Sequence, residues 1–272
     1  MASLQAKIAL ITGSTSGIGR GIAAHFASLG ALVVVHGPDA ESSNAAADEL
    51  RAAGREVDAV AGDLTSVAAC REVVRSVVDR HGGVDILVNN AATTARGSLE
   101  DATVEFWDNL MAINLRAPFI CLQEAVRSMK SRGGGSIVNI GSINAYVGLP
   151  NLGPYSVSKG GLMTMTKNAA LAFALYRIRV NQLNVGWTLT EGEERVQRAD
   201  GRGPNWVEEA VATRPFGRLL LPADVAHAAA YFASDDSIMV SGAVIDLEQF
   251  PIGALPTYAT DAHGPRKNTE EH

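Results

Sequence analysis

Tyr155, Lys159 and Ser142 have the types and spacing of an acid–base group. Tyr155 and Lys159 lie four residues apart, so on a helix they would share one face. An ammonium group close to a phenol favours the phenolate and lowers the pKa of the tyrosine, which would let it exchange protons near neutral pH. Ser142 ends an apolar run and could hydrogen-bond the same substrate oxygen. Taken alone, such a Tyr–Lys pair is more often a solvated helix pair, and a lone serine is more often a turn residue.

A glycine-rich turn is the second candidate site. Gly13, Gly17 and Gly19 follow the first apolar run, and a helical pattern begins there. Glycine lets the backbone approach a ligand closely, and the free N–H groups at a helix N-terminus favour a diphosphate. A side chain at Gly17 or Gly19 is therefore expected to block a cofactor. An ordinary turn could look the same, but this position after a first strand favours dinucleotide binding.

Two further signals follow later apolar runs. Asp63 comes after the third run, where its carboxylate could accept a hydrogen bond from an adenine amine or could cap a helix. Asn90 follows the fourth run, and its amide could shape the cofactor cleft or only satisfy a loop.

Composition narrows the class of protein. The 272 residues include 23 Lys and Arg against 29 Asp and Glu, a formal charge of −6, which argues against nucleic acid as the main partner. With 47% hydrophobic residues the chain is not expected to be disordered. Two cysteines and six scattered histidines provide no metal-ligand pattern. No apolar run is long enough for a membrane span, and residues 1–7 lack a signal-peptide core, so a cytoplasmic protein is expected.

Short apolar runs alternate with longer amphipathic stretches, which predicts the elements that must position these residues. The predicted strands are Ile8–Ile11, Leu32–Val35, Val57–Ala61, Ile86–Val88, Ile137–Ile140, Val180–Leu183 and Val244–Leu247, and the predicted helices cover 18–29, 41–53, 67–80, 104–130, 156–175 and 223–233. Continuous Val- and Ile-rich runs suit parallel strands covered on both faces. The sequence thus predicts an α/β fold with one doubly wound, Rossmann-type parallel sheet of about seven strands.

The chain is expected to form one domain over residues 1–255, because no linker divides it. Residues 187–221 interrupt the last crossover with charge, Gly and Pro, which is typical of a substrate lid. Residues 256–272 are polar and are expected to form an arm or a disordered tail.

Together, the glycine motif, Asn89-Asn90-Ala91, Ser142 and the Tyr–Lys pair resemble the short-chain dehydrogenase/reductase family over about residues 5–247. The resemblance implies an enzyme that transfers hydride between NAD or NADP and a secondary alcohol or ketone. By this resemblance Tyr155 is the general acid/base. Lys159 would bind the nicotinamide ribose hydroxyls and lower the pKa of Tyr155. Ser142 would orient the reacting oxygen, and Asn114 would hold a water in the proton relay. A homotetramer built through helices 104–130 and 156–175 and the last strand is also implied.

By the same resemblance and the motifs above, the cofactor would be held by the glycine-rich turn and by residues at the ends of the strands. These residues are Gly13, Thr15, Ser16, Gly17, Ile18, Gly19, His36, Gly37, Asp63, Leu64, Asn90, Ala91, Tyr155, Lys159, Gly186, Thr188 and Thr190. The sequence departs from the family pattern where Ala92 and Val185 replace a usual Gly and Pro, and where Leu247 and Glu248 replace two glycines. These departures bear on pocket shape and assembly rather than on the proton chemistry.

Cofactor choice is usually set at the end of the second strand. An acidic residue there selects NAD, and an arginine selects NADP. That position is Gly37 here, and no arginine follows. NAD is therefore favoured over NADP, although His36 or Arg20 could still meet a phosphate.

The substrate is expected above Tyr155, between residues 93–96, 143–152 and the lid. Its candidate contacts are Thr94, Asn144, Asn151, Trp187 and Glu191, with Glu193, Arg195 and Trp206 also nearby in the lid sequence. Such polar groups favour a sugar or polyol, unless the lid charges only face solvent. Two alternatives remain: a reductase of a lipid-like or cyclic ketone, and a non-catalytic cofactor-binding sensor or scaffold.

Overall fold

The computed structural model describes residues 2–146 and 148–252. Its centre is one sheet of seven parallel strands in the order β3-β2-β1-β4-β5-β6-β7. The strands are β1 (Ile8–Ile11), β2 (Leu32–Gly37), β3 (Val57–Ala61), β4 (Ile86–Asn89), β5 (Gly135–Ser142), β6 (Ile178–Val185) and β7 (Val244–Leu247). The prediction of a doubly wound, Rossmann-type sheet is confirmed. The predicted arm or tail at 256–272 lies outside the described residues.

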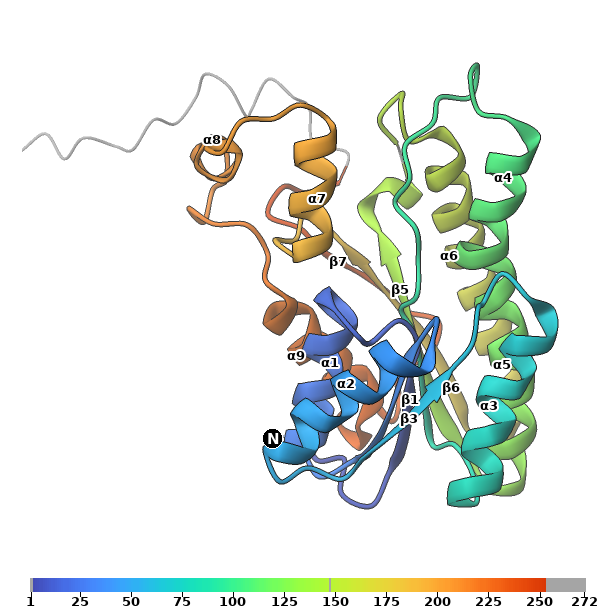
Figure 1. Ribbon diagram of the computed structural model, residues 1–272. Coiled ribbons are helices and arrows are strands. Elements are labelled where there is room, and N and C mark those ends of the chain that lie inside the picture. The colour runs from blue at the N-terminus through green and yellow to red at the C-terminus, as the bar shows by residue number, and fades with distance from the viewer. Residues whose placement is uncertain (1, 147, 253–272) are drawn as a thin grey trace, which may run out of the picture.

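Helices cover both faces of the sheet (Figure 1). One layer contains α1 (Gly17–Ser28), α2 (Ala40–Ala52) and α9 (Pro222–Ala233), and the other contains α3 (Val67–His81), α5 (Ala117–Ser131) and α6 (Gly153–Phe173). The apolar strands are thereby shielded on both sides, as parallel sheets require.

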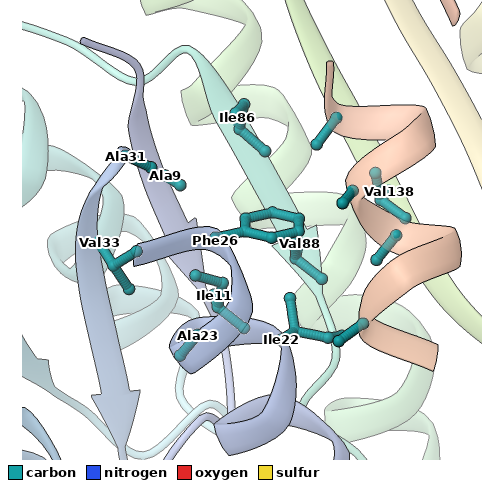
Figure 2. Close-up of a cluster of buried hydrophobic side chains, with 14 of the residues drawn as sticks. Ala9, Ile11, Ile22, Ala23, Phe26, Ala31, Val33, Ile86, Val88 and Val138 are labelled. Carbon is teal, nitrogen blue, oxygen red and sulfur yellow. The ribbon is translucent and has the colours of Figure 1, made fainter. Parts of the chain in front are cut away.

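Each strand supplies side chains to both layers. In β1, Ala9 and Ile11 belong to the cluster under α1 and α9, whereas Leu10 belongs to the cluster under α3 and α5. Figure 2 shows Phe26 and Ile22 of α1 lying over β1 and β4 in the first cluster. Both side chains are fully buried, and burial of each contributes about 1.5–3 kcal/mol to stability. This packing fixes the start of α1 above the end of β1.

Two segments differ from the predicted elements. The single helix predicted at 104–130 is α4 (Val104–Met111), a π-helical turn at Ala112–Arg116, and then α5. The predicted lid at 187–221 contains two helices, α7 (Glu191–Ala199) and α8 (Trp206–Ala212); they stand beyond the end of the sheet, drawn in orange in Figure 1. Helix α7 is highly polar and α8 has only seven residues, so neither has the long apolar stripe that reveals a helix in a sequence. Within the described residues, no helix has both the length and the apolar character to cross a bilayer.

Candidate active site

A cavity of about 1130 Å³ opens at the carboxyl ends of β1, β4, β5 and β6. Parallel α/β sheets bind ligands at this edge, at the point where the strand order changes direction. Here that point lies between β1 and β4, since β2 and β3 extend to one side and β5 to β7 to the other. Most of the predicted site residues line this cavity. They are Gly13, Thr15, Ser16, Gly17, Ile18, Gly19, His36, Asp63, Leu64, Asn90, Ala91, Thr94, Ser142, Asn144, Asn151, Tyr155, Lys159, Gly186, Trp187, Thr188 and Thr190.

Five of the candidate site residues named from the sequence do not line the cavity: Asn114, Gly37, Glu191, Arg195 and Trp206. Glu191 lies on the outer side of α7, where its carboxylate accepts a 2.8 Å hydrogen bond from Arg20. The neighbouring Glu193 lines the cavity instead. The positions of Asn114 and Gly37 are described below with the groups they contact.

Tyr155, Lys159 and Ser142 lie together in the floor of the cavity. Helix α6 begins at Gly153 with Pro154 in its first turn, and this start places Tyr155 and Lys159 on the same buried face. The Lys159 Nζ lies 5.7 Å from the centre of the Tyr155 ring and donates a 3.0 Å hydrogen bond to the carbonyl of Ile140 in β5. Ser142, the last residue of β5, hydrogen-bonds with the phenol.

Burial dominates the protonation of this group. The pKa of Tyr155 is raised, because burial disfavours the phenolate and the Glu193 carboxylate repels it, while the bond with Ser142 acts in the opposite direction. The predicted lowering of the Tyr155 pKa by Lys159 is therefore not found in this structure. Burial lowers the pKa of Lys159 itself to about 8. Near pH 7 the phenol and the ammonium are both protonated.

Asn114 lies behind the cavity wall, in the π-helical turn between α4 and α5. The extra residue of such a turn displaces the helix backbone locally, and π-turns are frequent at functional sites. The Asn114 carboxamide exchanges two hydrogen bonds with the backbone of Thr93 (2.8 and 3.0 Å) and donates another, of 3.2 Å, to Ser158. It thus ties the loop after β4 to α6, one residue from Lys159.

The start of α1 fits a diphosphate. Helices α2, α3, α4 and α7 each have a capping side chain that accepts from their first turn, whereas Ser16 provides no such bond to α1. The backbone of Gly17, Ile18 and Gly19 borders the cavity at this uncapped end. The free N–H groups and the positive end of the helix dipole are the groups that bind a dinucleotide diphosphate.

Gly17 and Gly19 of this turn are required for different structural reasons. A Cβ on Gly19 would collide with the carbonyl oxygen of Gly13 and the amide of Asn90, so the protein's own backbone fills that space. Gly17 has a φ of +53°, and a Cβ there would make an ordinary 3.5 Å contact with Thr190. The expectation that both positions serve mainly the cofactor is corrected for Gly19.

We expect Gly19→Ala to lower the free energy of unfolding by about 1–3 kcal/mol, because an inserted methyl group must displace backbone. Gly17→Ala should cost about 1–2 kcal/mol, through the left-handed backbone alone. Thermal and urea unfolding of both variants without cofactor measure the two effects. A Gly19→Ala protein as stable as the wild type would contradict this account of the turn.

His36 braces the same turn from β2. Its Nδ1 accepts a 3.1 Å hydrogen bond from the N–H of Gly13, and its Nε2 lies 3.0 Å from the carbonyl oxygen of Gly62. Both bonds are satisfied when the neutral ring carries its proton on Nε2. Burial lowers the pKa of His36 below its usual 6.5. The ring therefore supports the loop as a neutral group and is not a cation for a phosphate.

This lowered pKa predicts a pH-dependent stability. The unfolded chain binds a proton at His36 near pH 6.5, whereas the folded chain resists it, so the free energy of unfolding should fall as the pH drops from 7 towards 5. His25, whose pKa is lowered by burial and by His227, acts in the same direction. Urea unfolding between pH 5 and 8 should show a flatter profile for His36→Gln than for the wild type. A profile as steep as the wild type's would contradict the role given to His36.

The adenosine end of the cavity contains no cation at the end of β2. Gly37 is buried behind Thr15, Ser42 and Ser43, and a Cβ there would lie 2.6 to 2.9 Å from their side chains. The next residue, Pro38, lines the cavity instead. Gly37, the position predicted to select the cofactor, therefore does not border the cavity, whereas its neighbour Pro38 does.

Asp63 has a defined local role. Its carboxylate accepts hydrogen bonds from the N–H and the hydroxyl of Thr65 (2.9 and 2.7 Å), and these bonds lower its pKa. The cap of α3 is Ser66, so the alternative interpretation of Asp63 as the cap is wrong.

The lid forms the opposite wall of the cavity. Trp187 donates from Nε1 to Glu193 (2.7 Å), and Gln197 donates to the same oxygen (2.6 Å). Trp187 stacks on the buried Trp206, with ring centres 5.9 Å apart. Gln197, Asp200, Arg202 and Arg214 also line the cavity, although the sequence did not point to them. The four-residue spacing of Glu193 and Gln197, which places both on one face of a helix, was the only local pattern that could have indicated one of these residues. The other residues reach the cavity only through folding of distant segments.

Comparison with known proteins agrees with this geometry. A family model described as enoyl-(acyl carrier protein) reductase matches residues 13–248. Dehydrogenase/reductase SDR family member 4 of Sus scrofa is 36% identical over 243 residues, which cover 89% of this chain and 86% of that protein. The chain belongs to the short-chain dehydrogenase/reductase family. It is an oxidoreductase acting on CH–OH groups and ketones, and its cofactor is a nicotinamide dinucleotide.

Two other relatives bear on the chemistry of this short-chain dehydrogenase/reductase. D-beta-hydroxybutyrate dehydrogenase of Rhizobium meliloti is 34% identical over 256 residues, covering 89% of this chain and 97% of that one. The structure of L-sorbose reductase from Gluconobacter frateurii, complexed with NADPH and L-sorbose, superposes with a TM-score of 0.87 at 30% identity, covering 94% of this chain and 100% of that one.

This short-chain dehydrogenase/reductase has a carboxylate where the family pattern has a glycine. Glu248 follows β7 and lies against Gly186, where a Cβ would collide with its carboxylate. The Glu248 carboxylate accepts from the backbone N–H of Gln249 (2.6 Å). The departure noted in the sequence thus places a buried charge beside the end of β6.

Proposed function

We propose that this enzyme interconverts the secondary alcohol and the ketone of a polar sugar or polyol, with NAD as the preferred cofactor. The observation that carries the proposal is the buried Tyr155, Lys159 and Ser142 group at the floor of a cavity whose mixed walls include several polar side chains. A protein that only sensed a cofactor would not need a phenol and an ammonium buried together at this cost in desolvation.

In this proposal Tyr155 is the general acid and base. When bound, the nicotinamide supplies the hydride acceptor or donor. Tyr155 Oη holds the proton near pH 7, since its pKa is raised, and gives it to the carbonyl oxygen during reduction. Ser142 holds that oxygen beside the phenol. In oxidation Tyr155 receives the hydroxyl proton, so loss of its own proton must come first.

Lys159 and Asn114 support this proton transfer. The Lys159 ammonium is fixed by Ile140 and stabilises a phenolate as it forms, because opposite charges attract strongly in a buried site. We propose that the same ammonium group also binds the hydroxyls of the nicotinamide ribose. Asn114 acts through its neighbours: it holds Thr93 and Ser158, and we propose that the backbone of its π-turn holds a water that passes protons to Lys159.

A polar substrate is favoured over a lipid-like ketone by the side chains around Tyr155. Asn144, Asn151, Glu193 and Gln197 line the cavity and offer donors and acceptors to several hydroxyl groups. An acyl chain or a steroid would remove water from these groups without replacing its hydrogen bonds, which costs binding energy. The L-sorbose named for one solved relative is a sugar of this kind.

NAD is favoured by the charges at the end of β2. Pro38 and Asp39 supply no cation, and Asp39 already caps α2 by accepting from Ser42 N–H (2.8 Å). Arg20 is engaged with Glu191 and Glu49. A 2′-phosphate beside Pro38 would therefore have no cation from the end of β2, which is costly for a dianion.

A substrate panel tests the proposed function. Sugars, polyols and their oxidised forms would be assayed against lipid-like ketones, with NAD and NADP, by the absorbance of the reduced nicotinamide. We expect turnover of the polar compounds with NAD. Turnover confined to the lipid-like ketones would overturn the substrate class, and cofactor binding without any turnover would favour the sensor alternative.

We further propose a cytoplasmic homotetramer. Helices α4, α5 and α6 enclose a hollow lined by apolar groups that include Met111, Phe119 and Val157, and Phe119 and Val157 are about half exposed. Such patches are typical of protein interfaces. Light scattering should give four times the chain mass, and Phe119→Glu should reduce the assembly. A wild-type monomer would contradict the proposal.

A further inference from the structure

The substrate end of the cavity contains a guanidinium group without a hydrogen-bond partner. Arg214 lies between α8 and α9 and lines the cavity; 18% of its side chain is exposed. Within residues 2–146 and 148–252, its buried Nε donates to nothing. Its closest ion-pair contact, with Oε1 of Glu248, spans 3.8 Å, beyond the reach of a hydrogen bond. A buried donor of this kind is normally satisfied, so it calls for an explanation.

Arg214 is held in place by aromatic rings. Its guanidinium carbon lies 5.3 Å from the ring centre of Trp187 and 5.4 Å from that of Phe250. Trp187 is itself fixed by its bond to Glu193 and by its stacking on Trp206. Aromatic faces attract a cation but leave its N–H edge free. The guanidinium is therefore positioned before a ligand arrives.

The carboxylates around the cavity already have ion-pair or hydrogen-bond partners. Asp200 lies 2.6 Å from Arg96, and Glu193 accepts from Trp187 and Gln197. Glu248 accepts from backbone N–H groups. Arg96 also lines the cavity with a buried Nε that has no hydrogen-bond partner, but that Nε lies 2.6 Å from the Asp200 carboxylate. Arg202, the third arginine of the cavity, is 45% exposed. Among the described residues that line the cavity, Arg214 is thus the largely buried guanidinium with no carboxylate within hydrogen-bond distance.

We propose that Arg214 binds a carboxylate of the substrate, so that the enzyme acts on a hydroxy acid and its keto acid. This inference rests on the proposed function and deepens it: the preferred polyol-like substrate carries an acid group. The guanidinium fork matches a carboxylate with two parallel hydrogen bonds. A monoanion suits the site better than a phosphate dianion, because Glu193, Asp200 and Glu248 border the same space and would repel the second charge.

The test compares acids with their neutral counterparts. Hydroxy acids of four to six carbons, including hexonates, would be paired with the polyols of equal length, and a sugar phosphate would be added. Binding to the enzyme with NADH would be measured by calorimetry, alongside turnover with NAD. The proteins are the wild type, Arg214→Gln, Arg214→Lys and the control Arg198→Gln; Arg198 is exposed on α7 and does not line the cavity.

We expect the best hydroxy acid to bind the wild type at least about tenfold more tightly than its polyol, the effect of one charge-assisted pair. Arg214→Gln should abolish that difference, Arg214→Lys should keep part of it, and Arg198→Gln should keep all of it. The affinity for NADH should stay unchanged in Arg214→Gln. An unchanged preference in Arg214→Gln, a preference for the sugar phosphate, or a loss of NADH affinity with no effect on acids would overturn the inference.

The binding measurement separates this inference from the proposed function. If polyols are oxidised but no acid binds better than its polyol, the carboxylate site is wrong and the proposed function stands. If acids bind through Arg214 but no compound of the panel is turned over, the carboxylate site stands and the proposed function fails. Melting temperatures of the four proteins show whether each variant is folded.

Discussion

Tyr155→Phe is expected to lower kcat by about 10²–10⁴-fold, the usual contribution of a general acid or base, while cofactor affinity changes little. The ring of Tyr155 packs with Leu110 and Leu152, and phenylalanine retains that packing. Only the hydroxyl is lost, and with it the proton donor in the site. Steady-state rates in both directions, with calorimetric titration of NADH, measure the two effects separately.

Lys159→Ala is the informative comparison for Tyr155→Phe. It removes the ammonium bonded to Ile140 and, in the proposed mechanism, both the support for the phenolate and the ribose contact. It should therefore weaken cofactor binding as well as catalysis. If Tyr155→Phe retained more than about a tenth of the wild-type rate, the proton would have to come from another group and the assignment would be wrong.

The parts of the site that could be predicted depend on short-range patterns. The ends of apolar strands located Ser142 and Asn90, and a one-turn spacing located Tyr155 and Lys159, because the peptide geometry that places these side chains is local. Glycines followed by a helix located the phosphate-binding turn for the same reason. The family resemblance supplied the roles that spacing alone could not.

The remaining parts depend on contacts between distant segments. Arg214 meets Trp187 and Phe250 across intervals of 27 and 36 residues, and no periodicity marks such a meeting. His36 was predicted to face the cofactor, and it does border the cavity, but its ring nitrogens are used by Gly13 and Gly62. The direction of the Tyr155 pKa depends on how deeply the phenol is buried, which a residue pair in a sequence does not reveal.

The same limit applies to the residue that should set cofactor choice. Because an acidic residue at the family's position selects NAD, Gly37→Asp would be expected from the sequence to strengthen the preference for NAD. In the structure a Cβ at Gly37 would press on Thr15, Ser42 and Ser43, so this variant would disturb the loop as well as the charge. Pro38 borders the cavity and is the cleaner place to test the electrostatics.

Pro38→Arg is expected to shift the ratio of kcat/KM for NAD over NADP by about 10–100-fold towards NADP, because a guanidinium gives the 2′-phosphate a charge-assisted, two-point partner. The wild type should prefer NAD modestly, since Pro38 and Asp39 offer no positive charge to a 2′-phosphate. Pro38→Gln is the matched control: it removes the same ring and adds a side chain of similar length without charge, so it should leave the ratio near the wild type's. A wild-type preference for NADP of tenfold or more would contradict the interpretation of this loop. Because the pKa of the His36 ring is lowered by burial and its nitrogens are engaged, the phosphate partner would then have to be sought among Arg20 and the hydroxyls of Thr15, Ser42 and Ser43.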